Sequence, residues 1–150
     1  MEIKIEKATI EDLDRLQKIE RECFNEEAFS RERLAYLLET PNATGLKAKR
    51  NNKIVGFIIG LIKNRGMARI GQIFTLDVAT EHRRTGVGFR LLNELERVFL
   101  ENNVKTVYLE VRVDNEVALE LYHKKGYFEI EPLQNYYSRG VHGFRMKKEF

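Results

Sequence analysis

The chain has 150 residues, a length typical of one domain that buries about two-thirds of its unfolded surface without disulfides or metals. Its 43% hydrophobic and 33% charged residues describe a globular protein with a charged surface, and no apolar run is long enough to cross a membrane. The net charge of +3 comes from scattered basic residues, so direct nucleic-acid binding is not expected.

Cysteine usage and the N-terminal segment set the expected compartment. Residues 1–7 alternate charged and apolar side chains and lack the apolar core of a signal peptide. The single cysteine, Cys23, cannot form an internal disulfide, and its place on an apolar helix face favours packing over a reactive thiol. Three histidines and no second cysteine predict no metal cluster. We expect a cytoplasmic monomer or homodimer.

The first half of the chain predicts two helices and three strands. Residues 2–7 alternate as in a strand, and apolar residues then recur at helical spacing over residues 9–23. Residues 24–29 interrupt this pattern as either a connecting loop or a wall of a binding groove, and Ser30 then caps a second short helix. Two strands are expected at residues 43–50 and 53–63, around an asparagine turn.

The second half alternates strands with helices. The apolar run from Ile73 to Ala79 is too short for a helix and predicts a buried strand, and leucines at helical spacing follow it as far as Glu101. Residues 104–113 predict another strand. Asn115 then caps a helix that Gly126 can close. Strands are expected at residues 127–130 and 144–148. This order predicts a single α/β domain over residues 1–150.

A basic, glycine-containing loop joins the central strand to its helix. Its sequence is Arg83-Arg84-Thr85-Gly86-Val87-Gly88. The glycines let backbone approach a ligand, the arginines bring positive charge, and the new helix presents unpaired N–H groups. This combination predicts a phosphate-binding cradle. For these six residues alone, a turn that caps a helix and binds nothing is the alternative.

Three phosphate-binding patterns compete for this loop. The chain has no P-loop, because no Gly-Lys-Ser/Thr string follows a glycine at the required spacing. A dinucleotide fingerprint needs a third glycine where Leu91 stands, although Glu110 lies about where its ribose-binding acid would fall. The third pattern, Arg/Gln-x-x-Gly-x-Gly/Ala, is filled by Arg83, Gly86 and Gly88.

That third pattern resembles the pyrophosphate loop of the GNAT family of acyl-CoA-dependent N-acyltransferases. A second segment, Asn115-x-x-Ala118-x-x-Leu121-Tyr122-x-x-x-Gly126-Tyr127, resembles another mark of the family at the right separation. The order of elements agrees from about residue 3 to the end. The resemblance implies the GNAT fold, a mixed and mostly antiparallel sheet of about seven strands flanked by four helices.

Within the family, two segments resemble the RimI-type protein N-terminal acetyltransferases. They are Leu109-Glu-Val-Arg-Val-Asp-Asn115 and Asn135-Tyr136-Tyr137-x-x-Gly140. In those relatives the paired tyrosines border the peptide groove. The chain departs from the pattern at Val141-His142-Gly143, where two acids and an alanine are usual, and at Thr80, where a proline is usual. The resemblance therefore leaves the accepted peptide open.

The resemblance also implies acetyl-CoA as co-substrate and no metal. We expect the amides of the loop to hold its pyrophosphate, and a splayed strand edge to hold its pantetheine amides by backbone bonds. A backbone N–H on that edge would also stabilise the oxyanion. The expected cofactor-binding residues are Leu76, Val78, Arg83, Arg84, Thr85, Gly86, Val87, Gly88, Phe89, Asn115 and Tyr122.

The reaction requires a base for the amine and an acid for the departing thiolate. Glu110, at the end of a strand, is the expected base, directly or through water, and a surface strand acid is its alternative. Tyr122, on the next helix, is the expected acid, and simple core packing is its alternative. The reference pKa is near 8 for an α-amine and near 10.4 for a lysine amine, so a modest base suffices for a peptide N-terminus.

The expected function is transfer of an acetyl group from acetyl-CoA to the α-amine of a protein, a ribosomal protein being one candidate. Aromatic walls and carboxylates suit a cationic N-terminus. Acetylation of a lysine side chain or a small amine is the enzymatic alternative, and a CoA-binding module is the non-enzymatic one. The expected substrate-binding residues are Phe24, Glu26, Glu27, Tyr136 and Tyr137.

Overall fold

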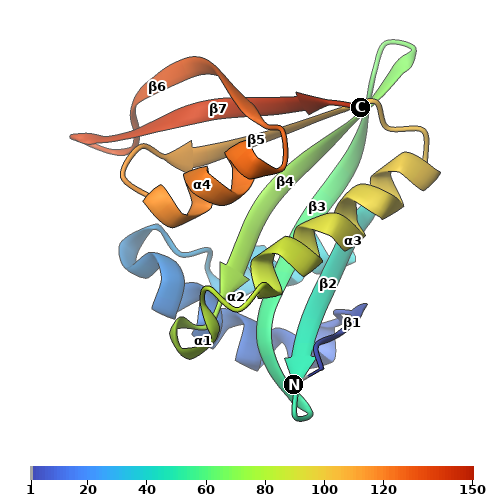
Figure 1. The fold of residues 1–150 in the computed structure, drawn as a ribbon, viewed down its shortest axis with the longest axis vertical. Coiled ribbons are helices and arrows are strands. Elements are labelled where there is room, and N and C mark those ends of the chain that lie inside the picture. Colours follow the sequence, from blue (N-terminus) through green and yellow to red (C-terminus); the bar gives the residue numbers. More distant parts are fainter. Residues whose placement is uncertain (1) are drawn as a thin grey trace.

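The structure, a computed structural model, describes residues 2–150 and is built on one seven-stranded sheet (Figure 1). The strands lie in the order β1-β2-β3-β4-β5-β7-β6, and every neighbouring pair is antiparallel except β4 and β5. They comprise β1 (Lys4–Lys7), β2 (Ala43–Arg50), β3 (Lys53–Arg65), β4 (Ala68–Val78), β5 (Thr106–Arg112), β6 (Phe128–Ser138) and β7 (Val141–Glu149).

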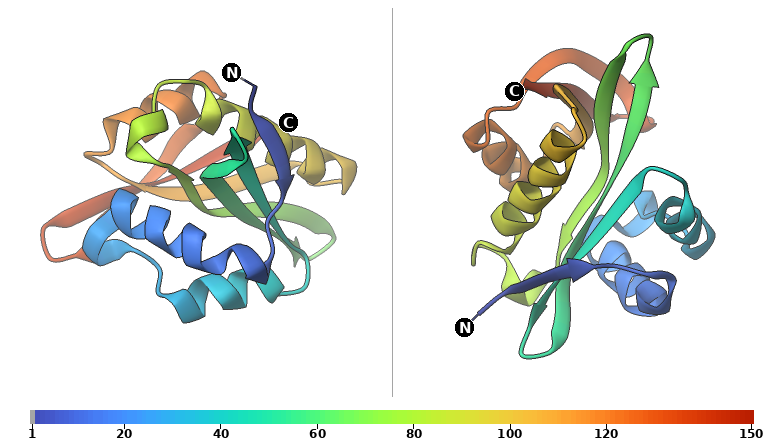
Figure 2. Two further views of the ribbon diagram at one scale, coloured as in Figure 1. Left: turned by 90° about the horizontal axis from the view of Figure 1, so that it is seen from below. Right: turned by 90° about the vertical axis from the view of Figure 1, so that its right-hand side faces the viewer.

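Helices cover both faces of this sheet. Figure 2 shows α1 and α2 on one face and α3 and α4 on the other. The helices are α1 (Leu13–Phe24), α2 (Arg31–Glu39), α3 (Val87–Glu101) and α4 (Glu116–Lys124). Three short 3₁₀ turns join them to the rest of the chain: η1 (Ile10–Asp12), η2 (Asn25–Glu27) and η3 (Thr80–His82). The predicted sheet with four flanking helices is confirmed.

Side-chain caps determine where two of the helices begin. The Ser30 hydroxyl accepts the Arg33 N–H at 3.1 Å, and Asn115 Oδ1 accepts the Ala118 N–H at 3.2 Å. Each cap satisfies one of the N–H groups that the first helical turn leaves unpaired. At the other end of α4, Gly126 has a φ of 94°, a left-handed conformation that suits a glycine at a helix end.

The larger hydrophobic core lies between the sheet and α3. Phe99 is fully buried there and packs over two strand glycines. A Cβ on Gly71 would lie 2.7 Å from the Phe99 ring, and a Cβ on Gly60 would lie 2.8 Å from it. The two glycines therefore let α3 approach the sheet closely, and burial of a side chain such as Phe99 contributes about 1.5–3 kcal/mol.

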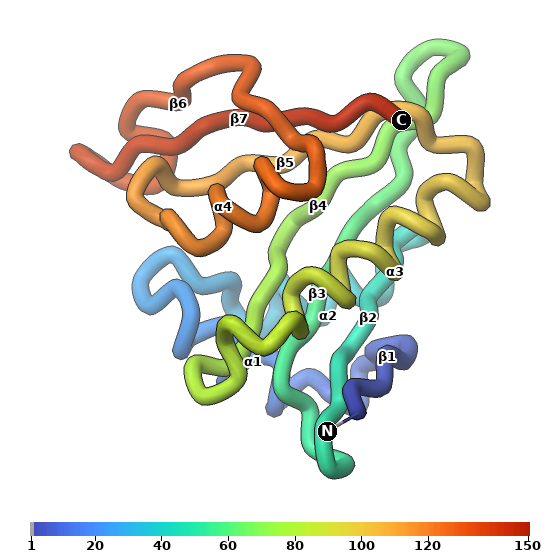
Figure 3. The backbone as a smooth tube through the Cα atoms, viewed as in Figure 1, coloured from blue at the N-terminus to red at the C-terminus, as the bar shows by residue number. Residues whose placement is uncertain are grey.

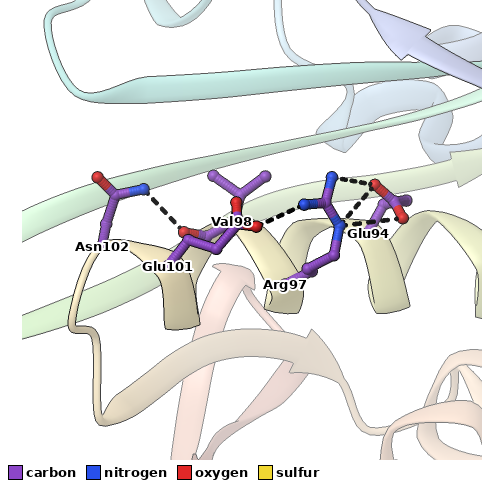
Figure 4. Close-up of polar contacts among 5 residues, drawn as sticks. All are labelled: Glu94, Arg97, Val98, Glu101 and Asn102. Carbon is purple, nitrogen blue, oxygen red and sulfur yellow. Dashed lines mark hydrogen bonds and ion pairs between the residues drawn. The ribbon is translucent and has the colours of Figure 1, made fainter.

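The outer side of α3 carries charged pairs instead. Arg97 contacts Glu94 at 2.8 Å and Glu101 at 2.7 Å, and the Asn102 amide donates to the Val98 carbonyl at 2.8 Å (Figure 4). Solvent-exposed pairs of this kind contribute little to stability. The position of α3 is therefore set by its apolar face.

The parallel pairing of β4 with β5 ends early. Its last register pair is Ile73 with Leu109, although β4 continues to Val78 and β5 to Arg112. Phe74 is an extra residue in the β3–β4 ladder, because Ile73 and Thr75 pair with consecutive residues of β3. Such a bulge bends its strand. Beyond it β4 and β5 diverge, as the tube in Figure 3 shows, and the sheet opens between them.

Several strands differ in length from their predictions. β4 begins at Ala68 rather than residue 73, and β6 continues to Ser138 rather than residue 130. The part of β4 before residue 73 pairs with β3 in a hairpin. This backbone pairing does not require an apolar side-chain pattern, so nothing in the sequence indicated it. β6 is an edge strand with most side chains exposed, so no alternation marks it. The first strand begins at Lys4, and β5 and β7 are Thr106–Arg112 and Val141–Glu149. Within residues 2–150, none of the helices combines the length and apolar character needed to span a membrane.

Candidate active site

A cleft of about 1490 Å³ occupies the opening between β4 and β5. It is bounded by the end of α1 and the η2 turn on one face of the sheet, and by the starts of α3 and α4 on the other. Thr85, Glu110, Tyr136 and Tyr137 do not line it. The predicted residues that do line it are Phe24, Glu26, Glu27, Leu76, Val78, Arg83, Arg84, Gly86, Val87, Gly88, Phe89, Asn115 and Tyr122.

The loop before α3 presents backbone amides to this cleft. Arg84 and Gly86 both have left-handed backbones, with φ of 60° and 89°. The first helical hydrogen bond of α3 runs from the Arg90 N–H to the Gly86 carbonyl at 3.0 Å, so the N–H groups of residues 87–89 have no partner inside the helix. A Cβ on Gly86 would meet nothing within 4 Å. The loop is therefore an open, positively polarised site suited to a phosphate.

The two loop arginines differ in their surroundings. Arg83 is held at the end of β4, where its Nε donates to the Val78 carbonyl at 3.1 Å and its Nη2 donates to Cys23 Sγ at 3.4 Å. Arg84 lines the cleft and has no carboxylate within 4 Å among residues 2–150. Arg84 is thus one cation available to a bound anion. The Thr85 hydroxyl donates to the His82 carbonyl, which stabilises the loop from outside the cleft.

The edge of β4 faces the cleft with its backbone. The Ala79 N–H donates to the Val55 carbonyl of β3 at 2.8 Å, so the preceding residue, Val78, turns its N–H and carbonyl away from β3. The Val78 carbonyl accepts hydrogen bonds from Arg83 and, at 3.4 Å, from the Cys23 thiol. The Val78 N–H is directed into the opening. Leu76 has the same orientation two residues earlier, where β5 no longer pairs.

Cys23 is half-buried beneath this edge and lines the cleft. Burial raises the pKa of its thiol, and the Arg83 guanidinium acts in the opposite direction. The net upward shift favours the protonated thiol, in keeping with a packing role.

Tyr122 reaches the cleft from α4. Its ring packs edge-on against Tyr127 with centroids 5.6 Å apart, and the residue is only 6% exposed. Burial raises the pKa of its phenol well above the ordinary value, with further contributions from Asp77 and Tyr137. The hydroxyl is therefore protonated at neutral pH and is available as a hydrogen-bond donor in the cleft.

Glu110 lies beside the cleft rather than in its lining. Alternate residues of β5 are buried towards α3 and α4, and Glu110 projects from the opposite face with a side chain 19% exposed. Its Oε1 accepts from Gln72 Nε2 at 3.0 Å, and its Oε2 accepts from Arg145 Nε at 3.1 Å. Each carboxylate oxygen retains a further lone pair, so the group is still able to accept a proton.

An ion-pair bridge spans the opening near Glu110. Arg112, at the end of β5, pairs with Glu27 of the η2 turn and with Asp114, whose Oδ2 lies 2.8 Å from Arg112 Nη2. Glu27 is therefore paired with an arginine, whereas Glu26 beside it lines the cleft with no cation within 4 Å among residues 2–150. Of the two predicted acids, Glu26 is thus the one without an ion-pair partner among the described residues.

The paired tyrosines stand on β6, outside the cleft lining. Their rings pack edge-on at 85° with centroids 5.0 Å apart. Tyr136 is exposed, whereas Tyr137 packs over Gly143, where a Cβ would lie 2.9 Å from the Tyr137 ring. Burial raises the pKa of Tyr137, and the neighbouring Glu110 and Glu27 charges add to this shift. Tyr137 is thus placed near both acids.

A buried acidic cluster beneath the cleft was not predicted. Glu20 and Asp77 are 1% and 0% exposed, and the Thr75 hydroxyl donates to Glu20 Oε1 at 3.1 Å. The other Glu20 oxygen accepts the Phe29 N–H at 2.9 Å, which ties the segment after η2 to β4. Burial, followed by the Glu20 charge, raises the pKa of Asp77 well above its usual range. The one available signal was an acid within the apolar run Leu76-Asp77-Val78.

The two residues that bind the Glu110 carboxylate were not predicted either. Gln72 and Arg145 bind its carboxylate from β4 and β7, and Arg145 also pairs with Glu131. A polar residue at position 72 in an apolar strand was the only signal for this arrangement. Residues 2–150 contain no group of three or more His, Cys, Asp or Glu side chains able to hold a metal ion.

Comparison with known proteins identifies the fold. A family model described as the acetyltransferase (GNAT) family matches residues 12–127. The chain belongs to this family. An N-alpha-acetyltransferase of Sulfurisphaera tokodaii is 30% identical over 154 aligned positions, which cover 97% of this chain and 92% of that protein. The predicted GNAT fold and acetyltransferase activity are thus confirmed.

Solved structures of the family agree in fold. The ribosomal-protein-S18-alanine N-acetyltransferase of Escherichia coli superposes with a TM-score of 0.85 at 23% identity, covering 99% of this chain and 94% of that one. Arabidopsis thaliana Naa50, in complex with the bisubstrate analogue CoA-Ac-MVNAL, superposes with a TM-score of 0.87 at 23% identity, covering 100% of both chains.

The cradle before α3 can be tested with one substitution. Gly86→Glu places a carboxylate among the loop amides, where it repels a phosphate, so we expect acetyl-CoA affinity to fall at least tenfold by calorimetry. Gly140→Glu is the matched control, because Gly140 also has a positive φ, of 79°, and open space at its Cβ, but lies outside the cleft. Equal affinity in the two variants would show that the loop does not hold the donor.

Proposed function

We propose that the protein transfers an acetyl group from acetyl-CoA to the α-amino group of a protein N-terminus, with a ribosomal protein as one candidate. The observation that carries this proposal is the cleft between β4 and β5, which is walled by residues from both faces of the sheet. A donor entering from the α3–α4 side can therefore meet an acceptor entering from the side of η2 and β6. The similarity to an N-alpha-acetyltransferase supports the α-amine as acceptor.

Acetyl-CoA fits the donor side of the cleft. The amides of residues 84–89 and the Arg84 guanidinium supply hydrogen bonds and charge for its pyrophosphate. The backbone of Leu76 and Val78 supplies partners for its pantetheine amides and an N–H for the oxyanion. Bound in this way, acetyl-CoA provides an activated thioester. The same fold in Arabidopsis Naa50 holds a compound that joins CoA to a peptide.

On the acceptor side, Glu110 serves as the base. Gln72 and Arg145 orient its carboxylate towards the face where the acceptor enters. It accepts a proton from the α-ammonium group, directly or through one water, and the resulting amine attacks the thioester carbonyl. At pH 7 roughly a tenth of α-amines are already neutral, so a weak base is sufficient. We assign the first acceptor residues to the space beside Phe24 and Glu26, which line the cleft, and Tyr136 and Tyr137 of β6, which lie outside its lining.

Tyr122 completes the reaction by protonating the departing CoA thiolate. Its phenol lines the cleft and carries a proton at neutral pH. The new amide and free CoA then leave on opposite faces of the sheet. We also propose that the reaction takes place in the cytoplasm, where a lone half-buried thiol such as Cys23 stays reduced.

A substrate panel tests the acceptor. Peptides with free N-termini, the same peptides blocked at the N-terminus but carrying an internal lysine, and polyamines are compared by CoA release. We expect free N-termini to be acetylated with a kcat/KM at least a hundredfold above that of internal lysines, since the lysine amine is neutral over two orders of magnitude less often. Preference for lysine or polyamine would overturn the proposal. Absence of CoA release with every amine tested would also overturn it and leave only CoA binding.

Two isosteric substitutions test the proposed acid and base. Tyr122→Phe removes the proton donor and Glu110→Gln removes the proton acceptor, and each is expected to lower kcat by about 10²–10⁴-fold with little effect on acetyl-CoA affinity. Glu110→Gln should also change the pH dependence of kcat. Tyr36→Phe serves as control, since Tyr36 is an exposed residue of α2 that lies outside the cleft. Full turnover in Tyr122→Phe, or an unaltered pH profile in Glu110→Gln, would reject that residue's role.

A further inference from the structure

We propose that the acceptor chain leaves the active site over a basic face formed by Lys63, Arg65, Tyr108 and Lys147, and that the enzyme therefore prefers acidic residues at about the third to fifth acceptor positions. This inference rests on the proposed function and specifies its substrate class. The four residues come from three strands, β3, β5 and β7.

The register of the sheet places these residues on the same face as Glu110. Gln72, which binds Glu110, pairs with Leu61 of β3 and with Tyr108 of β5. Lys63 follows Leu61 by two residues and therefore shares its face, and Lys147 is the β7 partner of Tyr108. The face thus continues directly from the proposed base towards the β3–β4 hairpin, which projects beyond the helices in Figure 1.

Aromatic rings hold two of these cations in place. Lys63 Nζ lies 5.7 Å from the centroid of the Phe74 ring, and the Arg65 guanidinium carbon lies 5.2 Å from the centroid of Tyr108. Arg65 Nη1 also donates to the Tyr108 hydroxyl at 3.4 Å. Cation–π contacts fix the side chains without neutralising their charge. Both residues remain exposed to an incoming peptide.

The charge of this face is only partly compensated. Neither Lys63 nor Arg65 has a carboxylate within 4 Å among residues 2–150, whereas Lys147 pairs with Glu149 at 2.7 Å. Further along the same face, Arg145 pairs with Glu110 and with Glu131. Positive charge without a partner is therefore concentrated on β3, away from the acids that receive the acceptor amine.

The distances match an acceptor in extended conformation. Tyr108 precedes Glu110 by two residues, which is about 7 Å along a strand, and an extended peptide advances about 3.3 Å per residue. An acceptor with its amine at Glu110 therefore brings its third residue level with Tyr108 and its next two within reach of Arg65 and Lys63. Carboxylates at these positions meet cations, and lysines meet like charge.

The test uses acceptor peptides that share an accepted N-terminal dipeptide and carry Asp, Ala or Lys at positions 3–5. At low ionic strength we expect KM to be about three- to tenfold lower for the Asp series than for the Lys series, with kcat little changed. Salt at 0.5 M should largely remove the difference, because it screens exposed charges. Lys63→Glu and Arg65→Glu, made separately, should abolish or reverse it.

Lys53→Glu is the matched control, since Lys53 is an exposed residue at the opposite end of β3. It makes the same change in charge and should leave the peptide preference intact. All variants should keep wild-type affinity for acetyl-CoA, which confirms an intact fold. Equal KM across the peptide series, or the same response in Lys53→Glu as in Lys63→Glu, would overturn this inference while N-terminal acetylation stands. Failure to acetylate any N-terminus would instead overturn the proposed function.

Discussion

The arrangement of the active site depends on the early end of the hydrogen-bonded pairing between β4 and β5. β4 and β5 pair in parallel only as far as Ile73 and Leu109, and a bulge at Phe74 bends β4 away. Beyond that point β4 still pairs with β3, but its edge towards β5 has no strand to bond, and unpaired backbone amides are costly. The N–H groups of Leu76 and Val78 on this edge are therefore available to a ligand, in keeping with the proposed role of the edge. The same divergence opens the sheet so that donor and acceptor can meet through it.

Polar contacts connect the two sides of this opening. Glu20 ties the segment after η2 to β4 through Thr75 and the Phe29 amide, and Arg112 joins β5 to Glu27 across the gap. Because these charges are partly or fully buried, removing one partner costs more than breaking an exposed pair such as that of Arg97. The η2 turn, which lines the acceptor side, is thus fixed from both strands.

Periodicity and local motifs predicted much of this structure. The helices, their caps at Ser30 and Asn115, and the loop at Gly86 all follow from residues close together in the chain. The extent of β6 could not be predicted, because an exposed edge strand has no apolar alternation. Nor could the contacts among Gln72, Glu110 and Arg145, which join residues from three strands and depend on the sheet register.

Amide hydrogen exchange, followed residue by residue with and without acetyl-CoA, tests the central claim most directly. If the open edge of β4 and the loop before α3 hold the donor, its binding should slow exchange at Leu76, Val78 and the amides of residues 84–89. Amides of the β1–β2 edge, on the far side of the sheet, should be unaffected. Binding of acetyl-CoA without protection at Leu76, Val78 and the loop would contradict the account.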